Sequence, residues 1–365
     1  MSKHFFLGQA SHYTRAEVLA HTFSIGTAKS SHKLRDFLTK KYQAKQVILT
    51  RNGRSALALA LKAALPKNSE VIVNGFTCYA VLEAIKAAGM KPVFADIDTT
   101  TIHFNVKTLT DTLEKHPDAE AMIIQNTFGI TVDITAIEKF AHKHNLKIFE
   151  DLAHCTGMLY PDGRMVGTVG VAAAMSFGKE KSIDTITGGA LIVNDENLKI
   201  EIPMNRPKFG DSMRARFYPL FGAIYRALSY VKLESVWMGF LIKTHQVERS
   251  ANSRLDITER PAHFVAKRAL KLFRKLPQNR PPIRQFVLVN FRDKALATLR
   301  EHGYYFDGFW FETPIAPERF YKLANFPEDE CPVATIVAKS IINFPTHYSK
   351  SQLKLARKLI KEFEK

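Results

Sequence analysis

Short β-branched runs alternate with helical stretches along residues 46–195, and this alternation constrains the fold more than any other feature of the chain. Strands that alternate with helices in this way form βαβ units, whose strands are parallel. The sequence therefore predicts an α/β fold with a mostly parallel central sheet. Strands are expected at 46–50, 70–74, 92–96, 121–125, 147–150, 171–177 and 190–193, and helices at 54–64, 79–88 and 134–144.

The second part of the chain has a different character. Residues 205–250 combine large apolar and aromatic side chains with scattered Arg and Lys, and the proline-containing stretch 278–284 resembles a linker. We expect a large domain over residues 1–250, including the stretch 205–250, and a smaller C-terminal α+β domain over 251–365. In the C-terminal part we expect helices at 261–276, 286–302, 332–339 and from 351, and β-structure at 308–312 and 341–344.

Positive charge is concentrated in one region. The formal net charge is +17, and residues 201–300, with 20 Lys and Arg against 7 Asp and Glu, carry 13 of it. A basic region on a near-neutral body is typical of a surface for phosphates, an acidic membrane or nucleic acid. A solvated basic face is the simpler alternative.

Composition excludes several classes of protein. Hydrophobic residues make up 46% and charged residues 24% of the chain, which is typical of a globular protein and not of a disordered one. Cys78, Cys155 and Cys331 form neither a disulfide framework nor a CxxC zinc site. We therefore expect no metal site. The sequence has no run of 18 apolar residues and no signal-peptide pattern, so we also expect a cytoplasmic protein.

Two segments of the α/β half carry polar groups next to expected strand ends. The segment 52–55 (Asn-Gly-Arg-Ser) lies between a strand and a helix start, where glycine allows close backbone approach and the first helical amides can bind an anion. Asp151 and His154 follow the strand at 147–150, where ligands of α/β proteins bind. An ordinary structural turn and a helix N-cap are the alternatives.

A third segment runs from Ser176 to Lys181 and precedes a Gly-Gly pair. A lysine just past a buried strand loses hydration, which lowers its pKa and favours Schiff-base formation. Lys179 and Lys181 both meet this description, and exposed loop lysines are the alternative. Together the three segments supply what pyridoxal 5′-phosphate (PLP) requires: a phosphate anchor, an acid for the pyridinium nitrogen and a Schiff-base lysine.

On these segments the sequence resembles the DegT/StrS-type sugar aminotransferases, which are PLP enzymes with the aspartate-aminotransferase fold. The resemblance runs from about Phe23 to Asp195 and resumes weakly near the C-terminus. It is carried by RNGRSALALALKAAL, EVIVNGFTCYAVLEAIKAAGMKPVFADID, FEDLAH, SFGKEKSIDTITGGALIVND, SANSRLD and INFPTHYS.

The resemblance implies roles for single residues. Lys181, and not Lys179, would be the catalytic Schiff-base lysine and would carry the proton. Asp151 would pair with the pyridinium nitrogen, and His154 would contact the ring or its 3′-oxygen.

Further residues would hold the cofactor. Ser176 and the backbone amides of Gly53 and Arg54 would bind the phosphate. The aromatic residue that stacks on the ring in the family aligns with Cys78, which is a departure, and the neighbouring Tyr79 is the candidate substitute.

The resemblance also implies an assembly. Asn252 in SANSRLD would reach the cofactor of a second subunit, so we expect a homodimer with the active site at its interface. The stretch 205–250, which separates the Gly-Gly strand from SANSRLD, departs from the family pattern. It is interpreted as a helical lid or dimer surface, as a peripheral contact with the inner face of the membrane, or as a basic groove for a nucleotide diphosphate.

The leading functional hypothesis is transfer of an amino group, from glutamate, to a keto-sugar carried by a nucleotide or a lipid, in amino-sugar or surface-polysaccharide biosynthesis. Lys181 favours transamination over the dehydration performed by relatives that have His in its place. Another PLP reaction, by a lyase, an aldolase or a desulfurase using Cys155, is one alternative. A non-catalytic basic binding protein is the other, and no pattern in the sequence supports specific nucleic-acid binding.

Overall fold

The computed structural model describes residues 5–6, 13–244, 246, 255–280, 282–305, 311–345 and 350–364. Its central sheet consists of β2 (Gln46–Thr50), β3 (Glu70–Asn74), β5 (Lys91–Ala95), β6 (Ala119–Ile124), β7 (Lys147–Asp151), β8 (Ala172–Ser176) and β9 (Gly189–Val193). The strand order is β2-β9-β8-β7-β6-β3-β5. β9 is antiparallel to both of its neighbours and the other pairs are parallel, so the predicted mostly parallel α/β sheet is confirmed.

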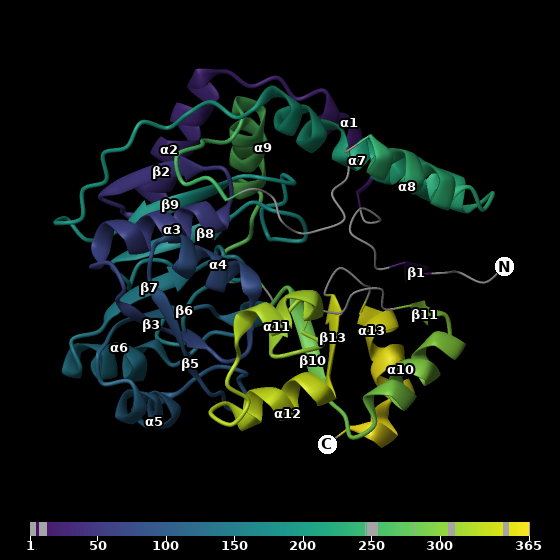
Figure 1. Ribbon diagram of the computed structural model, residues 1–365. Helices are drawn as coiled ribbons and strands as arrows, with labels where there is room; N and C mark the ends of the chain where they lie inside the picture. The colour runs from purple at the N-terminus through teal and green to yellow at the C-terminus, as the bar shows by residue number, and fades with distance from the viewer. Residues whose placement is uncertain are drawn as a thin grey trace.

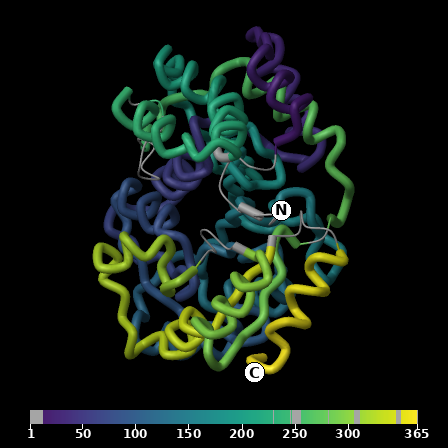
Figure 2. The backbone as a smooth tube through the Cα atoms, turned by 90° about the vertical axis from the view of Figure 1, so that its right-hand side faces the viewer, coloured from purple at the N-terminus to yellow at the C-terminus, as the bar shows by residue number. Residues whose placement is uncertain are grey.

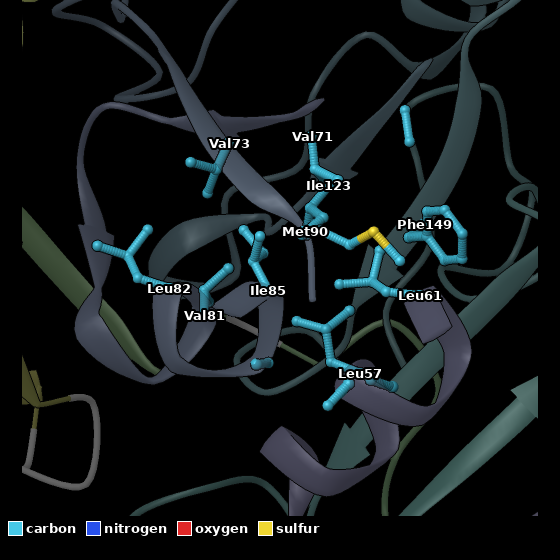
Figure 3. Packing of buried hydrophobic residues seen from close by; sticks show 14 of the residues in the cluster. Leu57, Leu61, Val71, Val73, Val81, Leu82, Ile85, Met90, Ile123 and Phe149 are labelled. Carbon is cyan, nitrogen blue, oxygen red and sulfur yellow. The ribbon is translucent and has the colours of Figure 1, made fainter. Parts of the chain in front are cut away.

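Helices cover both faces of the sheet (Figure 1). Successive strand residues point to opposite faces, and accordingly Val71 and Val73 of β3 join one hydrophobic core while Ile72 joins the other. Figure 3 shows the first core, where Leu57 and Leu61 lie among the side chains that pack against β3. This core is covered by α3 (Gly53–Ala64), α4 (Tyr79–Ala87) and α12 (Pro332–Ser340), and the second core by α2 (Ala28–Tyr42), α5 (Val106–Lys115), α6 (Ile134–Lys143) and α9 (His263–Phe273).

A smaller group of elements lies at the end of the molecule that carries the C-terminus (Figures 1 and 2). It has a core of its own, which includes Val287, Leu299 and Ile360. Two of its strands pair antiparallel, with Arg284 opposite Pro345 at one end and Leu288 opposite Ile341 at the other. Its elements are β10 (Arg284–Leu288), α10 (Arg292–Glu301), β11 (Tyr304–Tyr305), β13 (Ile341–Pro345) and α13 (Lys350–Leu359). Between them in the chain, β12 (Ile315–Ala316) and α11 (Tyr321–Ala324) pack in the first core of the large sheet.

The prediction of one helix over 286–302 is wrong in its first part. Phe286, Val287 and Leu288 belong to β10, because pairing with β13 decides the structure of this apolar run, and only α10 is helical. The β-structure expected at 308–312 lies mostly outside the described residues.

The division into two domains stays a prediction, and the packing of α9 bears on its boundary. α9 follows the expected boundary at 250/251, yet it packs along α2, with Ala266, Ala269 and Phe273 buried in the core of the large sheet. The separate C-terminal core begins only with β10. We therefore propose that the boundary lies between α9 and β10.

The stretch 205–250 is mainly helical where it is described. It contains α7 (Phe209–Ser229), which packs on α1 (Arg15–Thr22), and α8 (Glu234–Lys243), which packs back on α7. In Figure 1 these helices extend from the end of the molecule that carries α2 and α9. Among the helices that the structure describes, none is both long and apolar enough to cross a lipid bilayer.

Candidate active site

The three segments singled out in the sequence meet at the carboxyl edge of the sheet. Asp151 ends β7, and Ser176 ends β8, the neighbouring parallel strand. The turn after β2 joins them, because Asn52 forms a β-bridge with Gly188. A Cβ atom on Gly53 would lie 2.8 Å from the Cβ atom of Ser176. Glycine is therefore required for α3 to begin this close to β8.

The first turn of α3 has the features of an anion site. Asn52 caps the helix, and its side-chain oxygen accepts a hydrogen bond from the Ser55 amide at 2.8 Å. Amides at a helix start favour negative charge. Asn52 Nδ2 and Ser55 Oγ are buried without a hydrogen-bond partner among the described residues, so two further donors suit a phosphate. The Arg54 guanidinium pairs with Glu83 of α4.

Lys181 lies half-buried on the loop between β8 and β9, as the sequence predicts. Its Nζ atom is 2.9 Å from Nε2 of His154. Burial lowers the pKa of the Lys181 ammonium, against the opposing effects of Cys78 and Asp151. Burial also holds the pKa of His154 well below its ordinary value. Burial therefore disfavours the charged form of both groups.

The hydrogen bonds of His154 fix where the protons lie. Its Nδ1 atom accepts a hydrogen bond from the backbone N–H of Phe128 at 3.1 Å. A neutral imidazole has one N–H, so the proton is on Nε2. Nε2–H then donates to the Lys181 amine, which must offer a lone pair. A lysine that accepts this hydrogen bond is in its amine form, which is the nucleophilic form that a Schiff base requires.

Two residues that the sequence did not single out hold His154 in place. Phe128, in the short helix Thr127–Gly129, has a positive φ of 62° and stacks on the imidazole with ring centroids 6.4 Å apart. The buried Arg280 donates to the backbone carbonyls of His154 at 2.6 Å and Thr156 at 3.1 Å. Arg280 lies in the stretch interpreted as a linker, where its position beside two prolines gave no signal of burial.

The two acids of the FEDLAH segment have different environments. Glu150 is completely buried, and its carboxylate accepts hydrogen bonds from the Tyr160 hydroxyl and from the amides of Gly167, Val169 and Gly170 at 2.7–2.9 Å. It therefore anchors the loop between β7 and β8.

Asp151 points to the site edge and is only partly buried. Its Oδ1 atom accepts a hydrogen bond from the Ala153 amide at 2.9 Å. Burial raises the pKa of the Asp151 carboxyl, while the Ala153 amide and Lys181 lower it.

Cys78 and Tyr79 have different surroundings. Cys78 ends the short strand β4 (Thr77–Cys78), and Lys181 and Asp151 both affect its pKa, which burial raises. Tyr79 stacks instead on Phe320, with ring centroids 4.8 Å apart and planes 12° apart. Of these two residues, Cys78 is the one whose thiol is affected by Lys181 and Asp151. The ring of Tyr79, the candidate substitute, packs instead on Phe320 in the C-terminal part.

The remaining expected site residue, Asn252, lies outside the described residues, as do residues 346–349 of the INFPTHYS segment. The C-terminal part reaches the lysine loop elsewhere. Arg284 of β10 donates to Glu180 at 3.2 Å and to Asn343 of β13 at 2.9 Å. The residue next to Lys181 is therefore tied to both C-terminal strands.

Helix α7 contacts both site loops. Asp211 pairs with Arg51, the residue before the anion-binding turn, at 2.8 Å, and Arg51 also pairs with the buried Glu259. Lys179 Nζ donates to the Tyr218 hydroxyl at 3.2 Å and lies 4.4 Å from the centre of its ring. Of the two candidate lysines, Lys179 therefore faces α7 and Lys181 faces His154.

A half-buried lysine, a strand-end carboxylate and an anion-binding helix start, brought together at the edge of a mostly parallel sheet, define a PLP-binding α/β enzyme site. The buried donors beside Gly53 and the lysine Lys181 fit that group.

The chain belongs to the DegT/DnrJ/EryC1/StrS aminotransferase family, whose family model matches residues 13–218. The curated relatives are similar over part of the chain. A pleiotropic regulatory protein of Geobacillus stearothermophilus is 35% identical over 46% of each chain. A GDP-perosamine synthase of Caulobacter vibrioides is 31% identical over 53% of each. A dTDP-4-amino-4,6-dideoxy-D-glucose transaminase of Shigella dysenteriae is 32% identical over 48% of this chain and 45% of its own. The matches thus span about half the length of these relatives.

A sugar aminotransferase of Streptococcus pneumoniae, described as putative and solved in a PLP form, superimposes with a TM-score of 0.67 at 14% identity, over 98% of this chain and 99% of the other. This likeness confirms the expected fold. The family membership and the site together confirm PLP as the cofactor expected from the sequence.

Proposed function

We propose that this protein is a PLP-dependent aminotransferase that moves an amino group from an amino acid, glutamate, to a keto-sugar carried by a nucleotide. The observation that carries the proposal is the Lys181 amine, hydrogen-bonded to His154 beside Asp151 and the start of α3. The names of the relatives from C. vibrioides and S. dysenteriae support nucleotide-linked sugars as the substrate class and amino-sugar or polysaccharide biosynthesis as the setting.

The residues of the chain divide the work as follows. PLP supplies an aldehyde that condenses with amines and a ring that withdraws electrons. Lys181 Nζ would offer the lone pair that attaches the cofactor and would carry the proton afterwards. His154 Nε2–H would hold a proton beside Nζ, and the Asp151 carboxylate would pair with the ring nitrogen. The amides of Gly53 and Arg54 would bind the phosphate, with Ser176 beside them.

The partners belong to the same proposal. We infer a cytoplasmic homodimer in which Asn252 of one subunit completes the site of the other. We also infer a peripheral contact between the stretch 205–250 and the inner face of the membrane, which would suit a lipid-linked sugar. Exposed apolar side chains at the end of α7 and in α8 support this contact, since Tyr230 is 89%, Val236 68% and Phe240 53% exposed.

Borohydride trapping tests the proposed chemistry. The wild-type protein, loaded with PLP and reduced, should carry the cofactor covalently on Lys181, as located by peptide mass spectrometry. Lys181→Ala should carry none, while the matched variant Lys179→Ala should be trapped as the wild type is, because Lys179 faces Tyr218. Addition of glutamate before reduction should abolish trapping as the cofactor leaves in its amine form. No trapping on Lys181 would overturn the proposal.

A lyase or an aldolase on the same fold is the second candidate. Measurement of the products distinguishes these enzymes from an aminotransferase, because only the aminotransferase releases 2-oxoglutarate from glutamate in proportion to aminated sugar. The desulfurase alternative loses its support, because Cys155 is fully buried, its thiol contacts the Asp151 carbonyl oxygen at 3.5 Å, and burial raises its pKa.

A further inference from the structure

A groove of about 920 Å³ lies between α9 and the segment that joins α1 to α2. One wall is the outer face of α9, with Lys267, Lys271 and Arg274 exposed. The opposite wall contains Phe23 and Ile25. None of the groups of the proposed active site lines the groove.

Positive charge predominates in the groove. Six of its lining residues are Lys or Arg, and none of the lining residues that the structure describes is Asp or Glu, while the charges of Glu17 and Asp184 act on Arg268 from nearby. Arg268, at the base of α9's exposed face, has a buried Nε atom without a hydrogen-bond partner in the described part of the chain. A concave surface with one sign of charge attracts anions, and several cations together fit several phosphates better than one.

The groove also presents apolar side chains to solvent. Phe23 is 72% and Ile25 is 74% exposed, and Leu19 of the adjoining helix is 57% exposed. Such side chains next to lysines and arginines form the pattern of surfaces that insert apolar groups between anionic lipid headgroups. Nucleic acid would favour aromatic side chains spaced for base stacking, and Phe23 is the only aromatic residue among the lining residues that the structure describes.

Helix α7 connects this surface to the exposed apolar residues of the 205–250 stretch. Arg216 of α7 donates to the carbonyl oxygens of Thr22 and Ser24, at 3.1 and 2.8 Å, and Ser24 lines the groove. Figures 1 and 2 place α1, α2, α7 and α9 at the same end of the molecule, opposite α13.

We propose that this groove, with the basic face of α9 and the apolar pair Phe23 and Ile25, is the docking site for an anionic lipid surface. The cations contact the phosphates of the headgroups, and the two apolar side chains insert at the level of the acyl boundary. The inference deepens the membrane contact proposed for 205–250 but stands on separate residues, and its test does not use the aminotransferase activity.

Vesicle co-sedimentation of the PLP-loaded protein tests this docking site. The wild type should bind vesicles of phosphatidylcholine with roughly one-third phosphatidylglycerol and should not bind phosphatidylcholine alone, and added salt should weaken binding. The double variant Lys267→Glu/Lys271→Glu should bind the anionic vesicles at least about tenfold more weakly, because each basic residue near such a surface contributes about 1 kcal/mol. Phe23→Ser/Ile25→Ser should weaken binding while keeping the charge.

The matched control is Lys350→Glu/Lys354→Glu, which makes the same change of net charge on α13, at the other end of the molecule. This control should bind vesicles as the wild type does. Equal losses in the control and the groove variant would overturn the proposal, since only net charge would then matter. Wild-type protein that ignores anionic vesicles, or groove variants that dissociate a dimer without changing vesicle binding, would overturn it too. Borohydride trapping on Lys181 in all variants separates this failure from a failure of the proposed function.

Discussion

Replacement of Gly53 by alanine tests the close approach on which the cofactor site depends. The added methyl carbon would lie 2.8 Å from Ser176 Cβ, 3.2 Å from Ser176 Cα and 3.3 Å from the Met175 carbonyl oxygen. Carbon atoms in contact normally stay about 3.5–4.0 Å apart, so the methyl group intrudes by about 0.7 Å or more. None of these atoms is the free end of a flexible side chain, so the first turn of α3 must move away from β8.

The expected magnitude follows from this displacement. Overpacking of a close contact costs about 1–3 kcal/mol. If the displaced turn has to return for phosphate to bind, the dissociation constant of PLP rises about 5- to 150-fold. The unfolding midpoint should fall by about 1–4 °C, since a chain of 365 residues has an unfolding entropy of about 0.8 kcal/mol per degree.

Spectroscopic titration of the apoprotein with PLP measures the binding change, and thermal unfolding of the apoprotein measures the stability change. Gly239→Ala is the matched control, because a Cβ atom at this position in α8 has no atom within 4 Å. The control should bind PLP as the wild type does. A Gly53→Ala protein that binds PLP within about twofold of the wild type would refute the argument that close approach to Ser176 shapes the phosphate site.

Three further predictions follow from buried polar groups. Glu150→Gln puts an amide N–H against at least one hydrogen-bond donor of the β7–β8 loop. We expect the free energy of unfolding, measured by urea denaturation, to fall by about 2–4 kcal/mol. An unchanged midpoint would contradict the role of Glu150 as the anchor of this loop. Asp211→Asn weakens the ion pair with Arg51, so the affinity for PLP should fall a few-fold. Arg214→Gln, on the same helix, should have a smaller effect. Equal effects of the two substitutions would show that α7 does not act through Arg51. Burial lowers the pKa values of His21 and His103 to about 4, so the unfolded chain binds protons first as the pH falls below about 6.5, and stability is lost from there down to about pH 4. Between pH 7 and 5 the midpoint should fall by several degrees, and His103→Asn should reduce that fall; a midpoint that is independent of pH over this range would contradict the burial of neutral histidines.

The sequence determined the central sheet almost completely. Strand and helix periodicities between residues 46 and 193 correspond to β2, β3, β5–β9, α3, α4 and α6, because buried parallel strands are continuous apolar runs that are hard to mistake. The order of the three site segments along the chain was equally informative. Strand ends of a parallel sheet lie on one edge, so Asp151 and Ser176 had to be neighbours once their strands were parallel.

The pairing of segments that lie far apart along the chain could not be predicted from the sequence pattern. The run at 286–288 carries an apolar pattern that fits a helix as well as a strand, and only β13, more than fifty residues later, makes it a strand. Similarly, α9 follows the expected domain boundary in the sequence, but its apolar face packs in the core that α2 covers.

Chemical residue types by themselves predicted a lysine, an aspartate, a histidine and a glycine turn as the groups of a PLP site. Only the tertiary structure shows how these groups are supported. The backbone amide of Phe128 donates to Nδ1 of His154, whose Nε2 atom faces Lys181. Arg280 and α7 reach the site from segments far along the chain. Hydrogen bonds and burial depend on which groups share a place in space, and sequence spacing does not contain that information for residues so far apart.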